Sequence, residues 1–341
     1  MIWAEAQGCR VVDSDGRSYI DLSGGFGVAA LGHRSPEIEA AVRAQADRCM
    51  HALGDLAEAD VTAELRSRLG GEGHQVILGV TGEDAVEIAL RTALLVTGRP
   101  GIVAFTGAYH GTGLLALAAT GFERFRSPFA PWLPGPVHRR PYGEDPGALP
   151  ADTACVIVEP VQGRAGAQVP PDGFLERLRE RCDEAGALLI ADEIYTGLGR
   201  TGALWRSGDL ADLVTCGKAL GGGLPISACL MSAEHRRAWG LGPEAVYTHT
   251  HMGNPLAAAA ALVVLDRVPA LLERVTAAGE RFESAGWHGA GLLRAKEGDA
   301  FAAWERGVIA IPAGEDGRYM SATPPLTITD EEIDEALERI G

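Results

Sequence analysis

Lysine is almost absent from this chain. Of its 30 lysine and arginine residues only two are lysine, Lys218 and Lys296. Arginine keeps its proton in proteins and cannot form an imine, so it provides positive charge but no amine chemistry. A solitary lysine in such a chain is therefore a candidate for a reaction that needs a primary amine. The alternative is a surface lysine in a chain whose composition simply favours arginine.

Paired cysteines, long apolar segments and excess positive charge are also missing. The net charge of −16 disfavours nucleic acid and anionic membranes as partners. The longest apolar run, residues 256–265, is mostly alanine and too short to span a bilayer, and the first residues lack the basic start and apolar core of a signal peptide. The six cysteines lie far apart without a Cys-x-x-Cys motif, which offers no metal-binding spacing and indicates a reduced, cytoplasmic compartment.

The middle of the chain alternates between short apolar strands and helical segments. With 341 residues, of which 46% are hydrophobic, the chain can build one large domain and a smaller one. Continuous apolar strands separated by helices predict an α/β fold whose mostly parallel central sheet is covered by helices on both faces. The predicted strands are residues 76–78, 101–105, 155–158, 188–191 and 213–215.

Turn and capping residues mark the elements outside this sheet. Asp15-Gly16 is typical of a hairpin turn, and Pro36 is typical of the first position of a helix. The proline-rich residues 128–150 predict a long loop, and residues 307–311 predict a strand. Two further helices are predicted to begin after Asn254 and after Thr329.

Polar residues follow several of the predicted strands, at the edge of the sheet where ligands bind in such folds. Lys218 follows one strand, Asp192 a second and Tyr109 a third, and Gly82 opens a helix after a fourth. Pyridoxal phosphate needs these parts: an imine-forming lysine, an acid for its ring nitrogen, a stacking surface and a phosphate cradle. Taken singly, each residue has a plainer interpretation, as a turn glycine, a packed tyrosine or a solvated loop acid.

The order and spacing of these residues resemble the class III aminotransferases, the ornithine, acetylornithine and 4-aminobutyrate type, which are fold-type I pyridoxal phosphate enzymes. The most specific stretch runs from Leu188 to Gly202, and Lys218 follows in a Gly-Lys-Ala-Leu-Gly-Gly-Gly motif. The resemblance extends over nearly the whole chain. Its other motifs are Gly32-His33-Arg34-Ser35-Pro36, Gly107-Ala108-Tyr109-His110-Gly111, Val158-Glu159-Pro160-Val161-Gln162-Gly163, Thr250-His251-Met252-Gly253-Asn254-Pro255 and Pro324-Pro325-Leu326-Thr327-Ile328.

The resemblance implies a role for each matching residue. Lys218 would form the Schiff base with the cofactor and move the proton between substrate and cofactor, and Asp192 would keep the ring nitrogen protonated. Tyr109 and Ile194 would cover the two ring faces. The remaining cofactor-binding residues implied by the motifs are Gly82 and Glu83 through their backbone N–H groups, His110, Glu159, Tyr195, and Thr250 on the phosphate of the other subunit of a homodimer.

The resemblance also implies a division into domains. Residues 46–264 would form the large cofactor-binding domain. The small α+β domain would combine residues 1–45 with a shortened C-terminal part, residues 265–341.

Several positions depart from the family pattern. Glu83 stands where serine or threonine is usual, and Tyr195 stands where many members have a glutamine that bonds the ring oxygen. The family's small-domain arginine, three residues before Pro324, is replaced by Ser321, while Arg164 replaces its acidic partner. Arg164 is therefore a candidate for binding the substrate's carboxylate. The alternatives are that Arg164 points to solvent and the substrate lacks a carboxylate, or that Arg318 fills the role.

Three classes of function remain possible from the sequence. The first is an aminotransferase that exchanges an amino group between an amine or amino acid and a keto acid or aldehyde in two half-reactions. The second keeps the cofactor but acts as an aminomutase, racemase or decarboxylase. The third is a non-catalytic protein on the same scaffold, which the presence of Lys218, Asp192 and Tyr109 disfavours.

Overall fold

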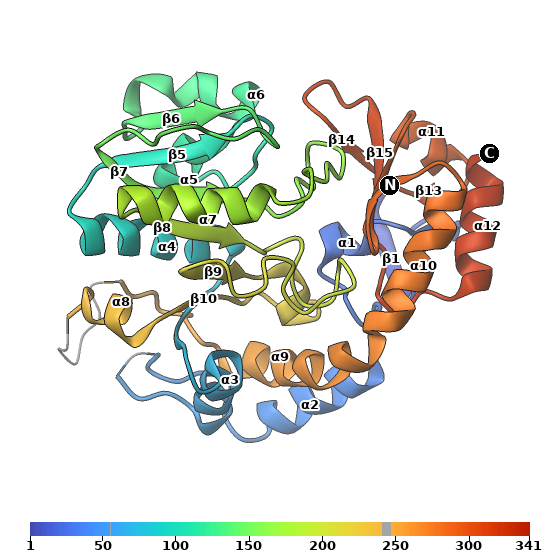
Figure 1. The fold of residues 1–341 in the computed structure, drawn as a ribbon. Coiled ribbons are helices and arrows are strands. Elements are labelled where there is room, and N and C mark those ends of the chain that lie inside the picture. Colours follow the sequence, from blue (N-terminus) through green and yellow to red (C-terminus); the bar gives the residue numbers. More distant parts are fainter. Residues whose placement is uncertain (55, 241–246) are drawn as a thin grey trace.

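A computed structural model describes residues 1–54, 56–240 and 247–341 of the chain. Its centre is a seven-stranded sheet in the order β4-β10-β9-β8-β7-β5-β6 (Figure 1). Strand β10 runs antiparallel to both of its neighbours, and the other adjacent strands are parallel. The bounds are β4 Gln75–Gly79, β5 Gly101–Phe105, β6 Val137–Arg140, β7 Thr153–Val158, β8 Leu188–Asp192, β9 Leu213–Cys216 and β10 Ser227–Met231. The mostly parallel sheet predicted from the sequence is thus present.

Alternating strand residues pack against helices on opposite faces of this sheet. On one face, Val103, Val156 and Leu189 are buried in a cluster with α7 (Phe174–Ala185). On the other, residues one position along each strand join the large core that includes α4 (Gly82–Thr97). Because side chains alternate along a strand, a continuous apolar run fills both faces at once.

The remaining helices up to residue 267 lie around the sheet and against one another. They are α1 Gly24–Gly27, α2 Pro36–Ala46, α3 Asp60–Gly70, α5 Leu114–Ala119, α6 Glu123–Arg126, α8 Ala233–Arg237 and α9 Pro255–Arg267, with 3-10 turns at Ser127–Trp132 and Lys218–Gly221. The helical stretch Pro255–Ser284 is long and apolar enough to cross a membrane by length and composition alone. Its alanine-rich half, α9, packs against α2 and α3, so its apolar content serves the protein core.

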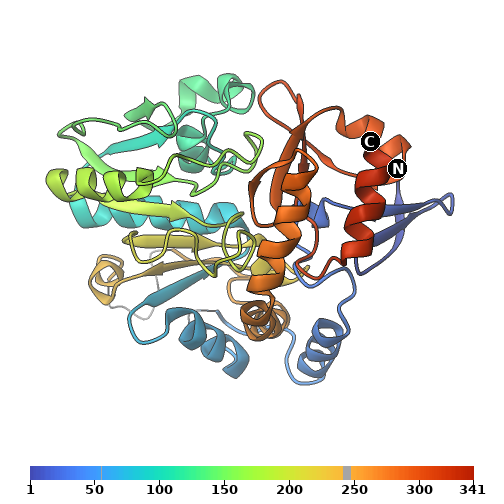
Figure 2. The same ribbon diagram turned by 45° about the vertical axis from the view of Figure 1, so that its right-hand side comes forward.

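The two ends of the chain lie side by side at one end of the molecule (Figure 2). Strands β1 (Trp3–Gln7), β2 (Arg10–Asp13) and β3 (Ser18–Asp21) form a sheet that the C-terminal strand β13 (Val308–Ile309) completes by pairing parallel with β3. A second sheet has the order β11-β12-β15-β14, and helices α10, α11 and α12 cover this region. Their bounds are β11 His288–Ala290, β12 Leu293–Glu297, β14 Ile311–Ala313, β15 Tyr319–Ala322, α10 Leu272–Ser284, α11 Ala300–Glu305 and α12 Asp330–Ile340, with a 3-10 turn at Val268–Leu271.

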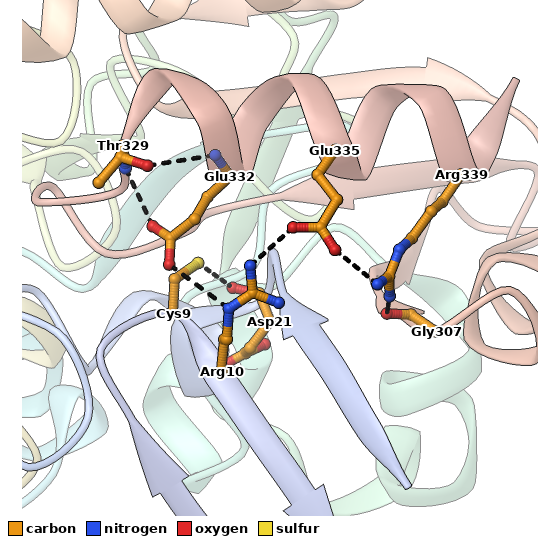
Figure 3. Close-up of polar contacts among 8 residues, drawn as sticks. All are labelled: Cys9, Arg10, Asp21, Gly307, Thr329, Glu332, Glu335 and Arg339. Atoms are coloured by element: carbon orange, nitrogen blue, oxygen red, sulfur yellow. Dashed lines mark hydrogen bonds and ion pairs between the residues drawn. The ribbon is translucent and has the colours of Figure 1, made fainter.

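A line of paired charges joins β2 to α12 (Figure 3). Nη2 of Arg10 lies 2.6 Å from Oε2 of Glu335, and Nε of Arg10 lies 4.0 Å from Glu332. Arg339 donates to Glu335 at 2.5 Å and to the carbonyl of Gly307 at 3.1 Å. We call the group Arg10, Glu332, Glu335 and Arg339 the terminal seam, because it ties the first strands to the last helix.

Some predicted elements differ from the structure. Residues 128–150 are not one long loop, since they contain a 3-10 turn and β6, which pairs parallel with β5. The expected strand 307–311 is divided at Ala310 between two sheets, as β13 and β14. The division into domains stays a prediction, and its boundaries at residues 45 and 264 fall in the last turns of α2 and α9, two helices that pack against each other.

Candidate active site

The carboxyl ends of the central strands open into one cavity. Ten of the residues predicted from the sequence line it, together with Gly111: Gly82, Glu83, Tyr109, His110, Glu159, Arg164, Asp192, Ile194, Tyr195 and Lys218. They come from the segments that follow β4, β5, β7, β8 and β9. Residues far apart in the sequence therefore meet at the edge of the sheet where α/β folds bind ligands.

Lys218 lies directly after β9 in a strained backbone conformation. Its φ of +31° is unusual for a residue with a side chain, and such strain is retained mainly at functional positions. Nζ lies 4.0 Å from the centre of the Tyr195 ring. Burial lowers the pKa of the Lys218 amine to about 8; the charges of Asp192 and Glu159 oppose the shift, and that of Arg164 adds to it. Near neutral pH a usable fraction of this amine is therefore unprotonated.

Asp192 ends β8 and is held by three hydrogen bonds. Its Oδ2 lies 2.7 Å from Nδ1 of His110, and its Oδ1 accepts from the backbone of Ile194 at 3.2 Å and from the hydroxyl of Thr215 at 3.3 Å. Both Asp192 and His110 are buried. Nε2 of His110 is buried without a partner among the described residues. This leaves the pair with a polar atom that needs a partner from outside the protein.

Glu159 follows β7 and fixes two backbone segments of the site. Its Oε1 accepts from the N–H of Tyr109 at 2.8 Å, and its Oε2 accepts from the N–H of Gly163 at 3.3 Å. Burial raises the pKa of Glu159 to about 7; nearby His110 opposes the shift, and Asp192 adds to it. The Tyr109 ring packs edge-on against Phe122 and Phe125, which holds it at the cavity wall.

The start of α4 offers an anion site. Thr81 and Asp84 form a reciprocal capping box. Among the backbone hydrogen bonds of the described residues, the N–H groups of Gly82 and Glu83 have no acceptor. Gly82 is required here, because a β-carbon would lie 2.9 Å from Cγ2 of Ile194. Two free N–H groups at a helix start suit a phosphate.

The unusual Glu83 side chain turns toward the loop that follows Tyr109 and His110. Its Oε2 accepts from the N–H of Thr112 at 2.7 Å and from its hydroxyl at 3.1 Å. A β-carbon at Gly111 or Gly113 would lie 3.1 Å or 2.9 Å from this side chain, so the glycines make room for it. The carboxylate therefore binds protein donors and leaves the Gly82 and Glu83 N–H groups free.

Tyr195, at the position where many members of the family it resembles have glutamine, packs beside Lys218. A β-carbon at Gly163 would lie 3.2 Å from the Tyr195 ring, so the glycine allows this packing. Burial raises the pKa of the Tyr195 phenol, which keeps it protonated and able to donate. Ile194 packs against the large core and presents part of its side chain to the cavity.

Thr250 is the one predicted site residue that lies elsewhere. It is exposed in a separate surface hollow lined by His51, Ala52, Leu53, Thr248, His249 and Thr250. It does not line the cavity around Lys218 in its own chain.

The structure shows which of the candidate carboxylate-binding positions, Arg164, Arg318 and Ser321, line the cavity. Arg164 lines the cavity, whereas Arg318 is exposed in a neighbouring hollow beside Asp316. Ser321 is buried in β15, paired with Ala295 and Ile311 on either side. Neither alternative position therefore places a side chain among the residues that line the cavity around Lys218.

Three residues that contact the predicted site residues are not predicted from the sequence, because they belong to no recognisable motif. Thr112 bonds Glu83, Thr215 bonds Asp192, and Phe125 packs on Tyr109. Thr215 could be found only from register, since it pairs with Asp192 across β8 and β9. The other two depend on the path of the loop after β5, which the sequence does not fix.

The fold and the site define a fold-type I pyridoxal phosphate enzyme, and solved structures of such enzymes have the same fold. The structure matches ornithine aminotransferase from Toxoplasma gondii with a TM-score of 0.91 at 30% identity, covering 99% of this chain and 89% of that one. It also matches an amine transaminase from an uncultivated Pseudomonas species in its pyridoxal phosphate-bound form, with a TM-score of 0.91 at 27% identity, covering 100% and 93%. The predicted fold class is confirmed.

Sequence relatives identify the family. The family described as Aminotransferase class-III matches residues 1–285. An acetylornithine aminotransferase from Corynebacterium efficiens is 38% identical over 98% of this chain and 90% of that protein, and the 4-aminobutyrate aminotransferase GabT from Escherichia coli is 35% identical over 94% and 81%. The chain belongs to the class III aminotransferases, which depend on pyridoxal phosphate.

The residues of the cavity suit this cofactor. The free N–H groups of Gly82 and Glu83 match its phosphate, and the unpaired Nε2 of buried His110 marks a place for a polar ligand. Lys218 is a partly unprotonated amine, and Asp192 is a buried acid beside it. The donor set thus contains a partner for each charged part of the cofactor.

Proposed function

We propose that this cavity is the aminotransferase active site, with Lys218 as the residue that binds pyridoxal phosphate covalently and moves the proton. The observation that carries the proposal is the Lys218 amine itself, whose pKa is lowered to about 8 beside Asp192 and Glu159. An amine near that pKa can both accept and return a proton near neutral pH. Pyridoxal phosphate, when bound, supplies a ring that accepts the electron pair left when a substrate carbon loses its proton.

The surrounding residues are proposed to bind and orient. Asp192, held by His110 and Thr215, would place a negative charge beside the ring nitrogen and so favour its protonated, positive form. Gly82 and Glu83 would donate backbone N–H groups to the phosphate. The cavity walls would be Tyr109 on one side and Ile194 on the other, with Tyr195, His110 and Glu159 completing the cofactor contacts.

The reaction is proposed to run as two half-reactions. An amine or amino acid gives its amino group to the enzyme, and a keto acid or aldehyde then takes it. The similarity to acetylornithine and 4-aminobutyrate aminotransferases supports this over the aminomutase, racemase and decarboxylase alternatives.

A single-turnover experiment tests this proposal. Holoprotein is mixed with a panel of amines and amino acids without an acceptor, while the absorbance of the bound cofactor and the released products are followed. We expect conversion of the cofactor to its amine form with one equivalent of the matching carbonyl compound. Release of carbon dioxide, or formation of an isomer without conversion, would instead establish one of the alternative reactions.

The protein is further proposed to act as a cytoplasmic homodimer. Thr250 supports the dimer, because it is exposed and lies outside the Lys218 cavity of its own chain. Its motif, residues 250–255, resembles the family motif that binds the cofactor phosphate of the other subunit. All six cysteines are free thiols, as suits a reducing compartment. Sedimentation of the holoprotein, with and without Thr250→Ala, tests the assembly. We expect a dimer that binds the cofactor more weakly in the variant, and a fully active monomer would refute the shared site.

A further inference from the structure

Arg164 carries a positive charge that the protein leaves unmatched. Its guanidinium carbon lies 4.8 Å from the centre of the Tyr109 ring and 5.5 Å from that of Phe125. Within the described residues no carboxylate lies within 4.0 Å of it, and its buried Nε has no acceptor. The two rings lie against the guanidinium but supply no counter-charge.

The acids of the cavity are already engaged elsewhere. Glu83 accepts from Thr112, Glu159 accepts from two backbone N–H groups, and Asp192 contacts His110. Among the described residues, Arg164 and Lys218 are the cavity cations without a carboxylate partner, and only the guanidinium of Arg164 cannot lose its charge. Arg164 is half-buried at the cavity wall, so its unpaired N–H groups are available to an anion that enters the cavity.

We propose that Arg164 binds a carboxylate of the substrate, so that the enzyme acts on amino acids in preference to plain amines. The proposal rests on the proposed function, because it places the carboxylate in the same cavity as the Lys218 amine. A planar guanidinium held on two aromatic rings presents its N–H groups as a fixed fork, which matches the two oxygens of a carboxylate.

The position of Arg318 provides a matched control. Arg318 also stacks on a tyrosine, at 5.0 Å from the Tyr319 ring, but it lies in the neighbouring hollow and its side chain is exposed. Replacing Arg318 by Met removes an arginine that also stacks on a tyrosine without touching the Lys218 cavity. Replacing Arg164 by Met removes the charge while keeping apolar bulk against Tyr109 and Phe125.

The first experiment measures binding without turnover. Butyrate and its neutral amide, butyramide, are titrated into the holoprotein by calorimetry for wild type, Arg164→Met, Arg164→Lys and Arg318→Met. We expect butyrate affinity to fall about 10- to 100-fold in Arg164→Met, the range for a lost hydrogen bond to a charged group. Arg164→Lys should fall less, and Arg318→Met should match wild type. Equal butyrate affinity in wild type and Arg164→Met, no butyrate binding to wild type, or a loss in Arg318→Met instead, overturns the proposal.

The second experiment separates this inference from the proposed function. Single-turnover rates are compared for 4-aminobutyrate and 4-aminobutanamide, which differ in charge but hardly in shape. In Arg164→Met we expect the rate for the acid to fall by the same 10- to 100-fold while the rate for the amide changes little. An equal loss for both rejects carboxylate recognition. A wild-type protein that converts no member of the panel of amines and amino acids, yet binds butyrate through Arg164, would contradict the proposed function and leave the anion site standing.

Discussion

The terminal seam and the active-site cavity treat charge in opposite ways. In the seam, Arg10 and Arg339 both contact Glu335, so each charge has a partner at the protein surface. In the cavity, Lys218 and Arg164 have no carboxylate partner within 4.0 Å among the described residues. The seam joins the two chain ends, whereas the cavity keeps charges available for a ligand.

The pKa values record the same contrast. The hydrogen bond from Arg10 lowers the pKa of Glu335, so the seam favours its charged form. In the cavity, burial lowers the pKa of Lys218 to about 8 and raises that of Glu159 to about 7, so both charged forms are disfavoured. A group held away from its preferred protonation state costs stability, and such groups gather where chemistry is done.

Replacing Lys218 should give the largest effect. Lys218→Arg keeps the positive charge but cannot form an imine or exchange a proton, so we expect turnover to fall by at least about 10⁴-fold. Borohydride reduction of wild type followed by peptide mass spectrometry should place the cofactor on Lys218. Lys296→Arg is the control and should keep normal activity. A cofactor label on Lys296 would refute the assignment.

Replacing Asp192 should give the next largest effect. Asp192→Asn keeps the shape of the side chain but removes the charge that faces His110 and the cavity. We expect the rate of the proton-transfer step to fall by about 10²- to 10³-fold, as when one preorganised electrostatic contact is lost. Circular dichroism should show an unchanged fold. A rate within a few-fold of wild type would mean that Asp192 does not stabilise charge in this reaction.

Glu159 should give a pH-dependent effect on stability. Between its ordinary pKa of 4.5 and its folded value of about 7, the folded state binds the extra proton, so the free energy of unfolding falls as pH rises. Over that range the loss is on the order of a few kcal/mol. Glu159→Gln cannot titrate and should lack this slope. Chemical denaturation of the apoprotein at several pH values measures it, and parallel slopes for variant and wild type would contradict the prediction.

The sequence predicts the cavity better than it predicts the seam. The strands of the sheet are continuous apolar runs, and the polar residues that follow them mark its carboxyl edge, so the grouping of Lys218, Asp192 and Tyr109 follows from local pattern. Arg10 and Glu335 are separated by most of the chain, and nothing local in either indicates the other. Their pairing depends on β13 joining the N-terminal sheet, a long-range event that two residues of strand do not reveal.

Partial burial and irregular backbone explain why the sequence predicts neither strand β6 nor the direction of the Glu83 side chain. Strand β6 lies at the sheet edge and is only half-buried, with arginine and histidine among its residues, so it lacks an apolar run. Its proline-rich flanks favour a loop prediction instead. The direction of the Glu83 side chain depends on the path of residues 111–113, where two glycines leave the backbone unspecified by sequence.

Breaking the terminal seam should give the smallest effect and should leave activity unchanged. Arg10→Met removes a partly exposed pair, so we expect the free energy of unfolding to fall by only about 0.5–1 kcal/mol. Because the pKa of Glu335 is lowered in the folded state, the pair contributes above the unfolded pKa of glutamate and is lost as pH falls through the folded value. The difference between wild type and Arg10→Met should therefore shrink in acid, the opposite of the Glu159 behaviour.

Two matched variants provide a comparison for the small loss of unfolding free energy expected in Arg10→Met. Arg43→Met removes an exposed pair within one helix, with Glu39 at 3.3 Å, and should cost no more than Arg10→Met. Arg164→Met removes a cavity charge that has no partner, so it should leave stability unchanged or raise it. Chemical denaturation of all three variants at pH 7 provides the comparison. If Arg164→Met proves the least stable of the three, Arg164 has a structural partner, and the contrast between a paired seam and an unpaired cavity does not hold.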